Sequence, residues 1–405
     1  EGMVMIQRNY ELILFGATGF TGQLAAEYLA THHPNVKWAI AGRDPHKLED
    51  LRKRIGHSDL PILIAASEDE GSLVEMAKQT KVIISTVGPY ARYGSLLLNS
   101  CAREGTHYCD LTGEAQWMAE VYEKTDALAR ESGARLVHSC GFDSIPSDLA
   151  VHVLQKAFKE RFGCYASSVS GRMGHFAGGV SGGTIESMML VGEQASRSSS
   201  LRKKLINPYL LYPPNIDPGW DKPDQIGIAW DDRFDSWTAP FLMAGINTKE
   251  VRRSHALLGL PYGKDFRYEE SQLVDNRAAA IISAGLTGAL IAAAFFGPAR
   301  ALLRKFLPNP GEGPNSVKRE AGFFEFWSHG IGGPSHEHGL RVKVSGKRDP
   351  GYGATSRMLV QAGLCLVFDQ LTVNGGIWTP ASAFGDWLVP RLDAVDIKFE
   401  ISEIN

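Results

Sequence analysis

A glycine-spaced turn directly after an apolar run is the feature that most constrains the fold. The letters LILFGATGFTG occupy residues 12–22 and place glycines at 16, 19 and 22. Where a strand passes into a helix, such glycines permit a tight turn, close approach of backbone to a pyrophosphate, and close packing of the helix on the strand. Phosphate oxygens would meet the free N–H groups at the helix N-terminus. The pattern predicts a dinucleotide-binding turn, with a simple strand-to-helix turn as the alternative.

The first third of the chain alternates short apolar runs with stretches whose apolar residues recur every three or four positions. The runs lie at residues 11–16, 36–43, 60–66, 81–88, 106–111 and 134–141. Continuous apolar runs are typical of strands buried on both faces, and right-handed crossovers join such strands into a parallel sheet. We therefore expect an α/β fold whose first domain, residues 9–160, is a Rossmann-type doubly wound parallel sheet.

The next part of the chain, residues 161–354, has a different pattern and is richer in Gly, Pro and Trp. CYASSVSGRMGHF, FDSWTAPFLMAGIN and HGLRVKVSGK alternate as antiparallel strands do. This indicates a second α+β domain built on an antiparallel sheet. The cleft between the two domains is then the expected substrate site.

An arginine at the end of the second expected strand indicates which dinucleotide binds. Sites for NAD usually carry an acidic residue about twenty positions after the glycines, whereas an arginine there accommodates the 2′-phosphate of NADP. Arg43 follows Gly22 by 21 residues. We expect NADP(H), with Arg43 as the phosphate clamp and Lys47 as a second cation; a solvated charge that opens a helix is the alternative for Arg43. The turn residues expected to bind the cofactor are Gly16, Thr18, Gly19, Phe20, Thr21 and Gly22.

Three further strand ends carry polar clusters, and ligands bind at the carboxyl ends of such strands. The first, STVGPY, is expected to pass alongside the cofactor ribose through Ser85, Thr86, Val87, Gly88 and Pro89, unless its Gly-Pro pair serves only to form a turn. The clusters also hold the candidate catalytic residues, which are Tyr90, Asp110, Thr112, Cys140, Asp143 and Ser144. Asp143 and Ser144 have a second interpretation, because they precede Pro146 and can cap a helix there.

The expected chemistry is hydride transfer from NADPH to an activated alkene, imine or carbonyl carbon. The negative charge that develops needs a preorganised donor, for which Tyr90, Thr112 and Ser144 are candidates. Asp110, Asp143 or Cys140 would then relay the proton. No tyrosine is followed by lysine four positions later, which argues against a short-chain reductase.

Together, FGATGFTG, AGR, STVGPY, YCDLTGE and CGFDSIPSDL resemble the saccharopine dehydrogenase-like oxidoreductases. GGVSGGTIESM and GGIWTPASAFGDWLVPRL, in the second half, are similar to the trans-acting enoyl reductase branch. The resemblance implies that residues 355–405 pack back on the first domain, and that NADPH reduces a double bond in a lipid-like or acyl-thioester substrate linked to a carrier. Two alternatives stay open: a saccharopine-type amino-acid reductase, for which Arg172, Arg341 and Arg357 could bind carboxylates, and a non-catalytic, membrane-associated NADP-binding protein.

Residues 278–299 contain no charged side chain and lie between Arg277 and Arg300. About 20 mostly apolar residues suffice to span a bilayer. Three interpretations stay open: a buried or dimer-interface helix, a helix in the membrane surface or along a lipid tunnel, and a true span. The basic residues at 300–305 would suit anionic head groups.

Composition excludes several other classes. A net charge of −3 provides no basic field for nucleic acid. Five scattered cysteines without a C-x-x-C motif argue against disulfides and thiolate metal sites, and the histidines at 335–339 define no third metal ligand. We expect a cytoplasmic protein without a metal, with peripheral membrane contact and a homodimer as further options.

Overall fold

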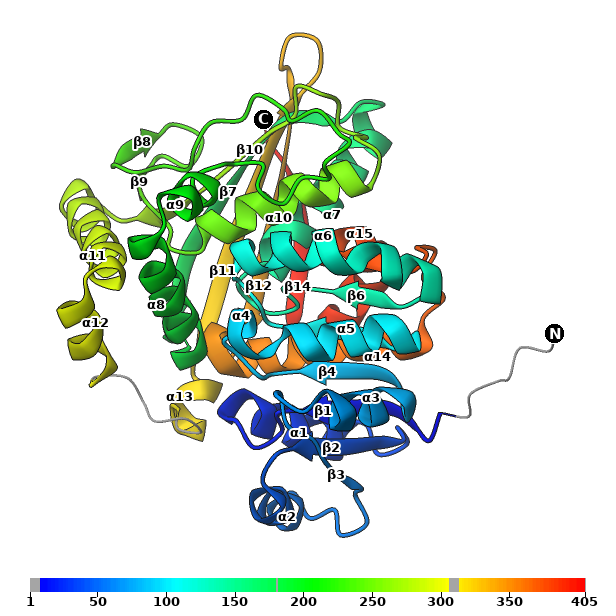
Figure 1. Cartoon of the computed structure of the whole chain (residues 1–405). Coiled ribbons are helices and arrows are strands. Elements are labelled where there is room, and N and C mark those ends of the chain that lie inside the picture. The colour runs from blue at the N-terminus through cyan, green and yellow to red at the C-terminus, as the bar shows by residue number, and fades with distance from the viewer. Residues whose placement is uncertain (1–7, 180, 306–312, 405) are drawn as a thin grey trace.

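The computed structural model describes residues 8–179, 181–305 and 313–404. Two seven-stranded sheets organise the chain (Figure 1). Residues 180 and 306–312 of the expected second domain, and residue 405 of the C-terminal segment, lie outside the described residues.

The first sheet is entirely parallel, with the strand order β13-β6-β5-β4-β1-β2-β3. Its strands are β1 (Tyr10–Phe15), β2 (Trp38–Gly42), β3 (Ile62–Ile64), β4 (Thr80–Ser85), β5 (His107–Asp110), β6 (Arg135–Val137) and β13 (Gly376–Trp378). Six of them are the six runs expected from the sequence. The Rossmann-type sheet is thereby confirmed, and the seventh strand comes from the far end of the chain.

Helices cover both faces of this sheet. Those between its strands are α1 (Phe20–His32), α2 (Pro45–Arg54), α3 (Glu70–Lys78), α4 (Tyr90–Tyr93), α5 (Ser95–Glu104) and α6 (Ala115–Ser132). Side chains alternate between the faces, so Leu12 and Ile84 enter one core cluster while Ile13 and Ile83 enter the other. Strands buried on both sides explain why the sequence shows continuous apolar runs.

The second sheet is mixed but largely antiparallel, as the sequence predicts, with the order β14-β12-β11-β7-β10-β9-β8. Its strands are β7 (Ala166–Ala177), β8 (Ala229–Asp231), β9 (Ser236–Ala239), β10 (Arg267–Val274), β11 (Phe323–Gly332), β12 (His338–Lys347) and β14 (Ile397–Glu403). Only the pairing of β7 with β10 is parallel. The stretch FDSWTAPFLMAGIN forms β9 and then the start of a helix, rather than one strand.

The remaining helices lie between and around the two sheets. They are α7 (Ile145–Phe162), α8 (Gly182–Arg197), α9 (Ser199–Leu205), α10 (Ala244–Leu257), α11 (Arg277–Phe295), α12 (Gly297–Arg304), α13 (Ser316–Glu320), α14 (Thr355–Phe368), α15 (Pro380–Phe384) and α16 (Leu388–Asp393), with a π-turn at Pro350–Ala354 and a 3-10 turn at Gly385–Trp387. Helix α14 packs on α1 and β4 of the first sheet, whereas β14 pairs with β12 of the second. The last fifty residues therefore contribute to both sheets.

Candidate active site

The glycine turn after β1 has the geometry that a dinucleotide site requires. Gly16 has φ +82°, and a Cβ there would lie 2.6 Å from Val87 Cγ2. A Cβ on Gly22 would lie 2.2 Å from the carbonyl oxygen of Gly16, so only glycine lets α1 approach the turn. Gly19 precedes the first residue of α1, and a Cβ there would be 3.4 Å from that same oxygen. The free N–H groups of α1 are thus left open to an anion beside Gly19.

The end of β4 is joined to this turn by hydrogen bonds. Thr86 Oγ1 donates to the carbonyl oxygen of Gly16 at 2.9 Å. The segment 85–89 therefore lies beside the glycine turn, where the sequence analysis expects the cofactor ribose. Of the turn residues, Thr18 accepts from Gln23 Nε2 at 2.6 Å, and Phe20 packs edge-on against Tyr352 at 4.7 Å.

Arg43 and Lys47 lie at the end of β2 and in the first turn of α2, on the same edge of the sheet as the glycine turn. Both side chains are exposed. Asp44, the carboxylate nearest to them, accepts from the backbone N–H groups of His46 and Lys47 at 3.0 and 3.1 Å. Oδ1 of Asp44 thus caps α2, whereas the guanidinium of Arg43 forms no hydrogen bond or ion pair with the described residues.

A cavity of about 430 Å³ opens beside these strand ends and extends toward α8, α10 and α11. Of the predicted site residues it is lined by Thr21, Thr86, Gly88, Tyr90, Thr112 and Asp143. Its far walls are mainly apolar and include Met173, Phe176, Met188, Val191, Phe241, Leu242, Met243, Ile246 and Ile291. The cavity therefore reaches the cofactor turn at Thr21 and has a mainly apolar lining, to which a few polar side chains such as Thr184, Ser187 and Lys249 contribute.

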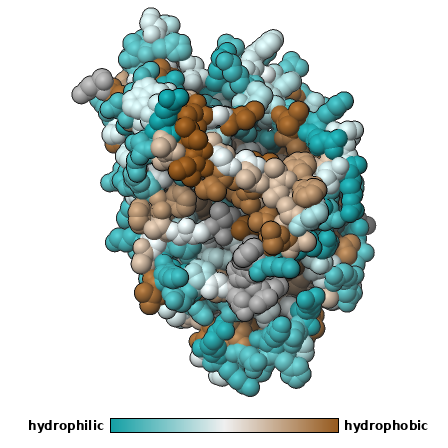
Figure 2. Space-filling view, turned by 90° about the vertical axis from the view of Figure 1, so that its left-hand side faces the viewer, coloured by the Kyte–Doolittle hydropathy of each residue, from teal (hydrophilic) through white to brown (hydrophobic). Residues whose placement is uncertain are grey.

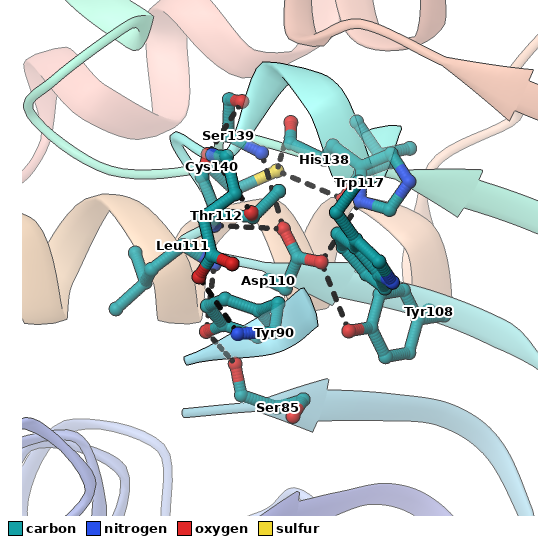
Figure 3. A network of polar contacts seen from close by, with 12 residues as sticks. Ser85, Tyr90, Tyr108, Asp110, Leu111, Thr112, Trp117, His138, Ser139 and Cys140 are labelled. Carbon is teal, nitrogen blue, oxygen red and sulfur yellow. Dashed lines mark hydrogen bonds and ion pairs between the residues drawn. The ribbon is translucent and has the colours of Figure 1, made fainter. Parts of the chain in front are cut away.

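Asp110 forms the centre of a buried network rather than part of the cavity wall (Figure 3). Its Oδ2 accepts from Tyr108 Oη at 2.9 Å and lies 2.8 Å from Nδ1 of His138. Its Oδ1 accepts from the backbone N–H groups of Thr112 and Ser139 at 3.0 and 3.2 Å. With four partners and no exposure, this carboxylate holds the loops after β5 and β6 together.

Three other predicted catalytic residues also have protein partners. Tyr90 Oη donates to the carbonyl oxygen of Ser85 at 3.0 Å, and burial raises the pKa of this phenol well above its usual value. The buried Cys140 thiol donates to the carbonyl oxygen of Val137 at 3.6 Å, and burial raises its pKa as well. Ser144 precedes α7 but makes no side-chain capping bond; its hydroxyl donates to Asn247 Oδ1 at 3.0 Å instead.

Thr112 and Asp143 face the cavity. Thr112 Oγ1 accepts from the backbone N–H of Glu114 at 3.2 Å, which leaves its own hydrogen to donate. Removal from water raises the pKa of Asp143 to about 6, an effect that the Thr184 hydroxyl partly offsets. Asp143 is therefore mostly ionised at pH 7.

Among the cavity residues that were not predicted, three carry polar side chains with defined partners. Lys249 lies on α10, donates from Nζ to the carbonyl oxygen of Gly245 at 2.7 Å, and has a pKa lowered by burial. Ser139 adopts φ +60° and donates to the carbonyl oxygen of Thr112 at 2.8 Å. Glu114 accepts from the backbone N–H of Tyr90 at 2.7 Å and from Ser187 Oγ of α8 at 2.8 Å. Glu114 belongs to the motif YCDLTGE, which the sequence analysis singled out. No local pattern indicates Lys249, because only the fold brings α10 to the cavity.

The described residues contain no cluster of three or more His, Cys, Asp or Glu side chains arranged to hold a metal ion. His338 instead stacks on Phe162 at 4.3 Å.

Comparison with known proteins agrees with this geometry. Residues 12–137 match the family model of the saccharopine dehydrogenase NADP binding domain. A Mycobacterium tuberculosis relative whose name places it with the trans-acting enoyl reductases is 37% identical over 99% of this chain and 100% of its own. The trans-acting enoyl reductase of Mycobacterium ulcerans is 35% identical over 100% of both chains. The chain belongs to the trans-acting enoyl reductase family.

The family also fixes the cofactor and the class of reaction: the chain is an NADP-dependent oxidoreductase. A saccharopine dehydrogenase from Saccharomyces cerevisiae shares the fold, with a TM-score of 0.52 at 13% identity and coverage of 98% of this chain and 100% of that one. The turn has no room for a Cβ at Gly16 or Gly22, as is typical of a dinucleotide-binding turn, and the exposed Arg43 at the end of β2 fits the 2′-phosphate of NADP(H).

Proposed function

We propose that this trans-acting enoyl reductase family member uses NADPH to reduce the carbon–carbon double bond of a long-chain acyl thioester. The observation that carries the proposal is the cavity, which reaches the cofactor turn at Thr21 and is lined mainly by apolar side chains. A pocket of that kind binds a hydrocarbon chain and orients its head with a few polar groups. The names of the relatives support the same reaction.

The arginines do not favour an amino-acid substrate. Arg172 is buried in ion pairs with Asp231 and Glu269 at 2.7 and 2.6 Å. Arg341 stacks on Phe234 at 4.3 Å, and Arg357 lies over the ring of Tyr28 at 4.8 Å. None of the three lines the cavity, where Lys249 is the one basic side chain contributed by the described residues. A dicarboxylic amino acid would lack the paired cations that its carboxylates need.

The proton donor that we propose is Lys249. When bound, NADPH supplies a hydride to the β-carbon of the conjugated double bond, which leaves an enolate that must gain a proton at the α-carbon. Lys249 has spare N–H donors and a pKa lowered toward the working pH, which favours proton transfer. Asp143, mostly ionised at pH 7, is the poorer donor.

The thioester oxygen needs a hydrogen-bond donor while it carries negative charge. Thr112 offers its free hydroxyl hydrogen at the cavity wall. Asp110 fixes the backbone of Thr112, so we assign Asp110 a positioning role, and we assign the same role to Tyr90, Cys140 and Ser144, which contact backbone or buried side chains.

The test is NADPH oxidation by the full chain with trans-2-enoyl thioesters of increasing chain length. We expect turnover to rise with chain length, and we expect deuterium from 4-deuterated NADPH to appear at the β-carbon of the product by mass spectrometry. The aldehyde–glutamate pair, which condenses to an imine, serves as the competing substrate with NADPH, and saccharopine is assayed in the reverse direction with NADP+. Turnover of these with none of the thioesters would overturn the proposal.

A further inference from the structure

Helix α11 presents an uncharged face to water beside the cavity. Among the described residues it is the helix long and apolar enough to cross a membrane, yet only Ala280 and Ala294 are buried. Its water-facing positions recur every three or four residues and include Ile281, Ile282 and Leu286, which are 55%, 62% and 68% exposed. A water-facing helix normally places polar residues there. Figure 2 shows apolar side chains gathered on this side of the molecule.

The connections of α11 argue against a span. Strand β10 precedes the helix and β11 follows it, and both strands pair with β7 in one sheet. A single span would place these two neighbours of β7 on opposite sides of a bilayer. The helix also packs on α8, where a Cβ on Gly192 would lie 2.4 Å from the carbonyl oxygen of Ala294. One side of α11 is therefore fixed to the protein and the other is free to lie along a surface.

The charges that flank α11 indicate the kind of surface that this helix can bind. Residues 277–305 contain four cations and no acidic residue, with Arg277 at one end and Arg300, Arg304 and Lys305 at the other. A two-fold contact with a second copy would bring this same cationic patch against itself, with no carboxylate in either stretch to neutralise it. An anionic lipid surface instead offers phosphates to the cations and an apolar interior to Ile281, Ile282 and Leu286.

One wall of the cavity reaches this same surface. Ile291 of α11 lines the cavity and is 45% exposed. Val191 of the adjoining helix α8 and Phe176 at the end of β7 line it too. The apolar lining of the cavity is thus continuous with the uncharged face of α11.

We propose that α11 and α12 form a docking surface for an anionic lipid membrane, with the α11 wall of the substrate cavity facing the bilayer. The helix lies in the plane of the interface, its exposed side chains among the acyl chains and its flanking cations at the head groups. Binding to lipid is independent of the reaction proposed above, so failure of either proposal leaves the other standing.

The test is cosedimentation of the full chain with vesicles of phosphatidylcholine alone and with 30% phosphatidylglycerol. We expect binding to the anionic vesicles that weakens with salt. The double variant Ile282→Gln and Leu286→Gln should reduce the partition coefficient at least tenfold, whereas Arg304→Gln and Lys305→Gln should reduce it about fivefold per cation on anionic vesicles. Ile401→Gln, a like change on β14 at the opposite edge of the second sheet, should bind as the wild type does.

Circular dichroism and NADPH binding verify that each variant is folded. The proposal is overturned if the wild type stays in the supernatant with both vesicle types, or if the Ile282 and Leu286 variant binds as tightly as the wild type. A dimer in sedimentation velocity that this variant dissociates, without vesicle binding, would assign the face to a second copy. Capture of an acidic carrier protein without vesicle binding would assign it to that partner.

Discussion

The glycines of the first turn have separable roles at the scale of single atoms. Gly22→Ala places a Cβ against the Gly16 carbonyl oxygen, so we expect it to lower the free energy of unfolding by about 1–3 kcal/mol and to weaken NADPH binding. Gly19→Ala has more room in the protein and should leave stability nearly unchanged, yet weaken NADPH binding because its Cβ faces the expected pyrophosphate. Urea denaturation and NADPH fluorescence titration measure the two effects. Unaltered NADPH affinity of Gly19→Ala would show that the cofactor does not cross this turn.

Arg43 tests the choice between the two nicotinamide cofactors. Its exposed guanidinium has no competing partner among the described residues, so we expect Arg43→Gln to raise the KM for NADPH about tenfold or more through loss of a charge-assisted hydrogen bond. The KM for NADH should change little, since NADH has no 2′-phosphate. Lys53→Gln, at the other end of α2, is the matched control. An equal rise in the KM values for NADPH and NADH would show that Arg43 does not bind the 2′-phosphate.

Lys249 can be tested with two substitutions that separate charge from proton transfer. Lys249→Met should lower kcat about 100-fold while the Kd for NADPH stays within twofold, as expected for a general acid. Lys249→Arg retains the positive charge but cannot release a proton near neutral pH, so it should also be slow. In the wild type, kcat should fall as pH rises through the lowered pKa of Lys249. Wild-type turnover by Lys249→Met would exclude Lys249 as the donor.

At the scale of elements, α10 is unusual because it is buried and yet carries many polar residues. Ser139 Oγ lies 3.2 Å from Glu250 Oε1 across the space between the sheets. Asn247 Nδ2 donates to Glu270 at 2.7 Å, and Ser254 Oγ donates to Asp148 at 2.6 Å. Burial raises the pKa of Glu250 to about 8 and the pKa values of Asp148 and Glu270 to about 7.

These raised pKa values predict how stability depends on pH. Between pH 4.5 and 8 the folded state holds a proton on Glu250 that the unfolded state releases, so the free energy of unfolding should fall as pH rises through this range. Glu250→Gln keeps the Oε1 acceptor for Ser139 but cannot ionise. The decrease in the free energy of unfolding between pH 5 and 8 should therefore be smaller in this variant by about 1 kcal/mol or more. Urea denaturation at pH 5, 6, 7 and 8 measures this. Glu123→Gln, an exposed change on α6, should keep the wild-type slope.

The sequence predicts well those elements whose pattern is local. Six strands of the parallel sheet could be predicted because burial on both faces produces continuous apolar runs. Strand β12 could be predicted from its alternation of apolar and polar residues, and the glycine turn from the steric limits on its backbone. The burial of helix α10 could not be predicted, because its polar sequence NTKEVRRSH is typical of a segment that faces water. The hydrogen bonds that satisfy these side chains come from elements distant in the sequence. Lys249 was missed for the same reason, and the roles of the predicted residues around Thr112 stay predictions.

At the scale of the whole molecule, the two sheets share one core. The cluster that holds Leu12 and Ile84 of the first sheet continues through α7 and α14 to Phe324 and Val342 of the second. Helix α14 fits directly on the strands, because a Cβ on Gly363 would lie 2.5 Å from Ile84 Cδ1. The cofactor-binding sheet therefore has one face covered by a helix from the last fifty residues.

This shared core predicts that the first domain does not fold alone. A fragment of residues 9–160 keeps the glycine turn and Arg43 but loses β13 and α14, which leaves Leu12 and Ile84 facing water. Exposing a buried aliphatic side chain costs about 1.5–3 kcal/mol, and several such side chains exceed the stability of a typical domain. The full chain should show one calorimetric transition that NADPH shifts upward, whereas the fragment should show none. A fragment that unfolds cooperatively and binds NADPH as tightly as the full chain would mean that the first sheet is complete without its C-terminal helix.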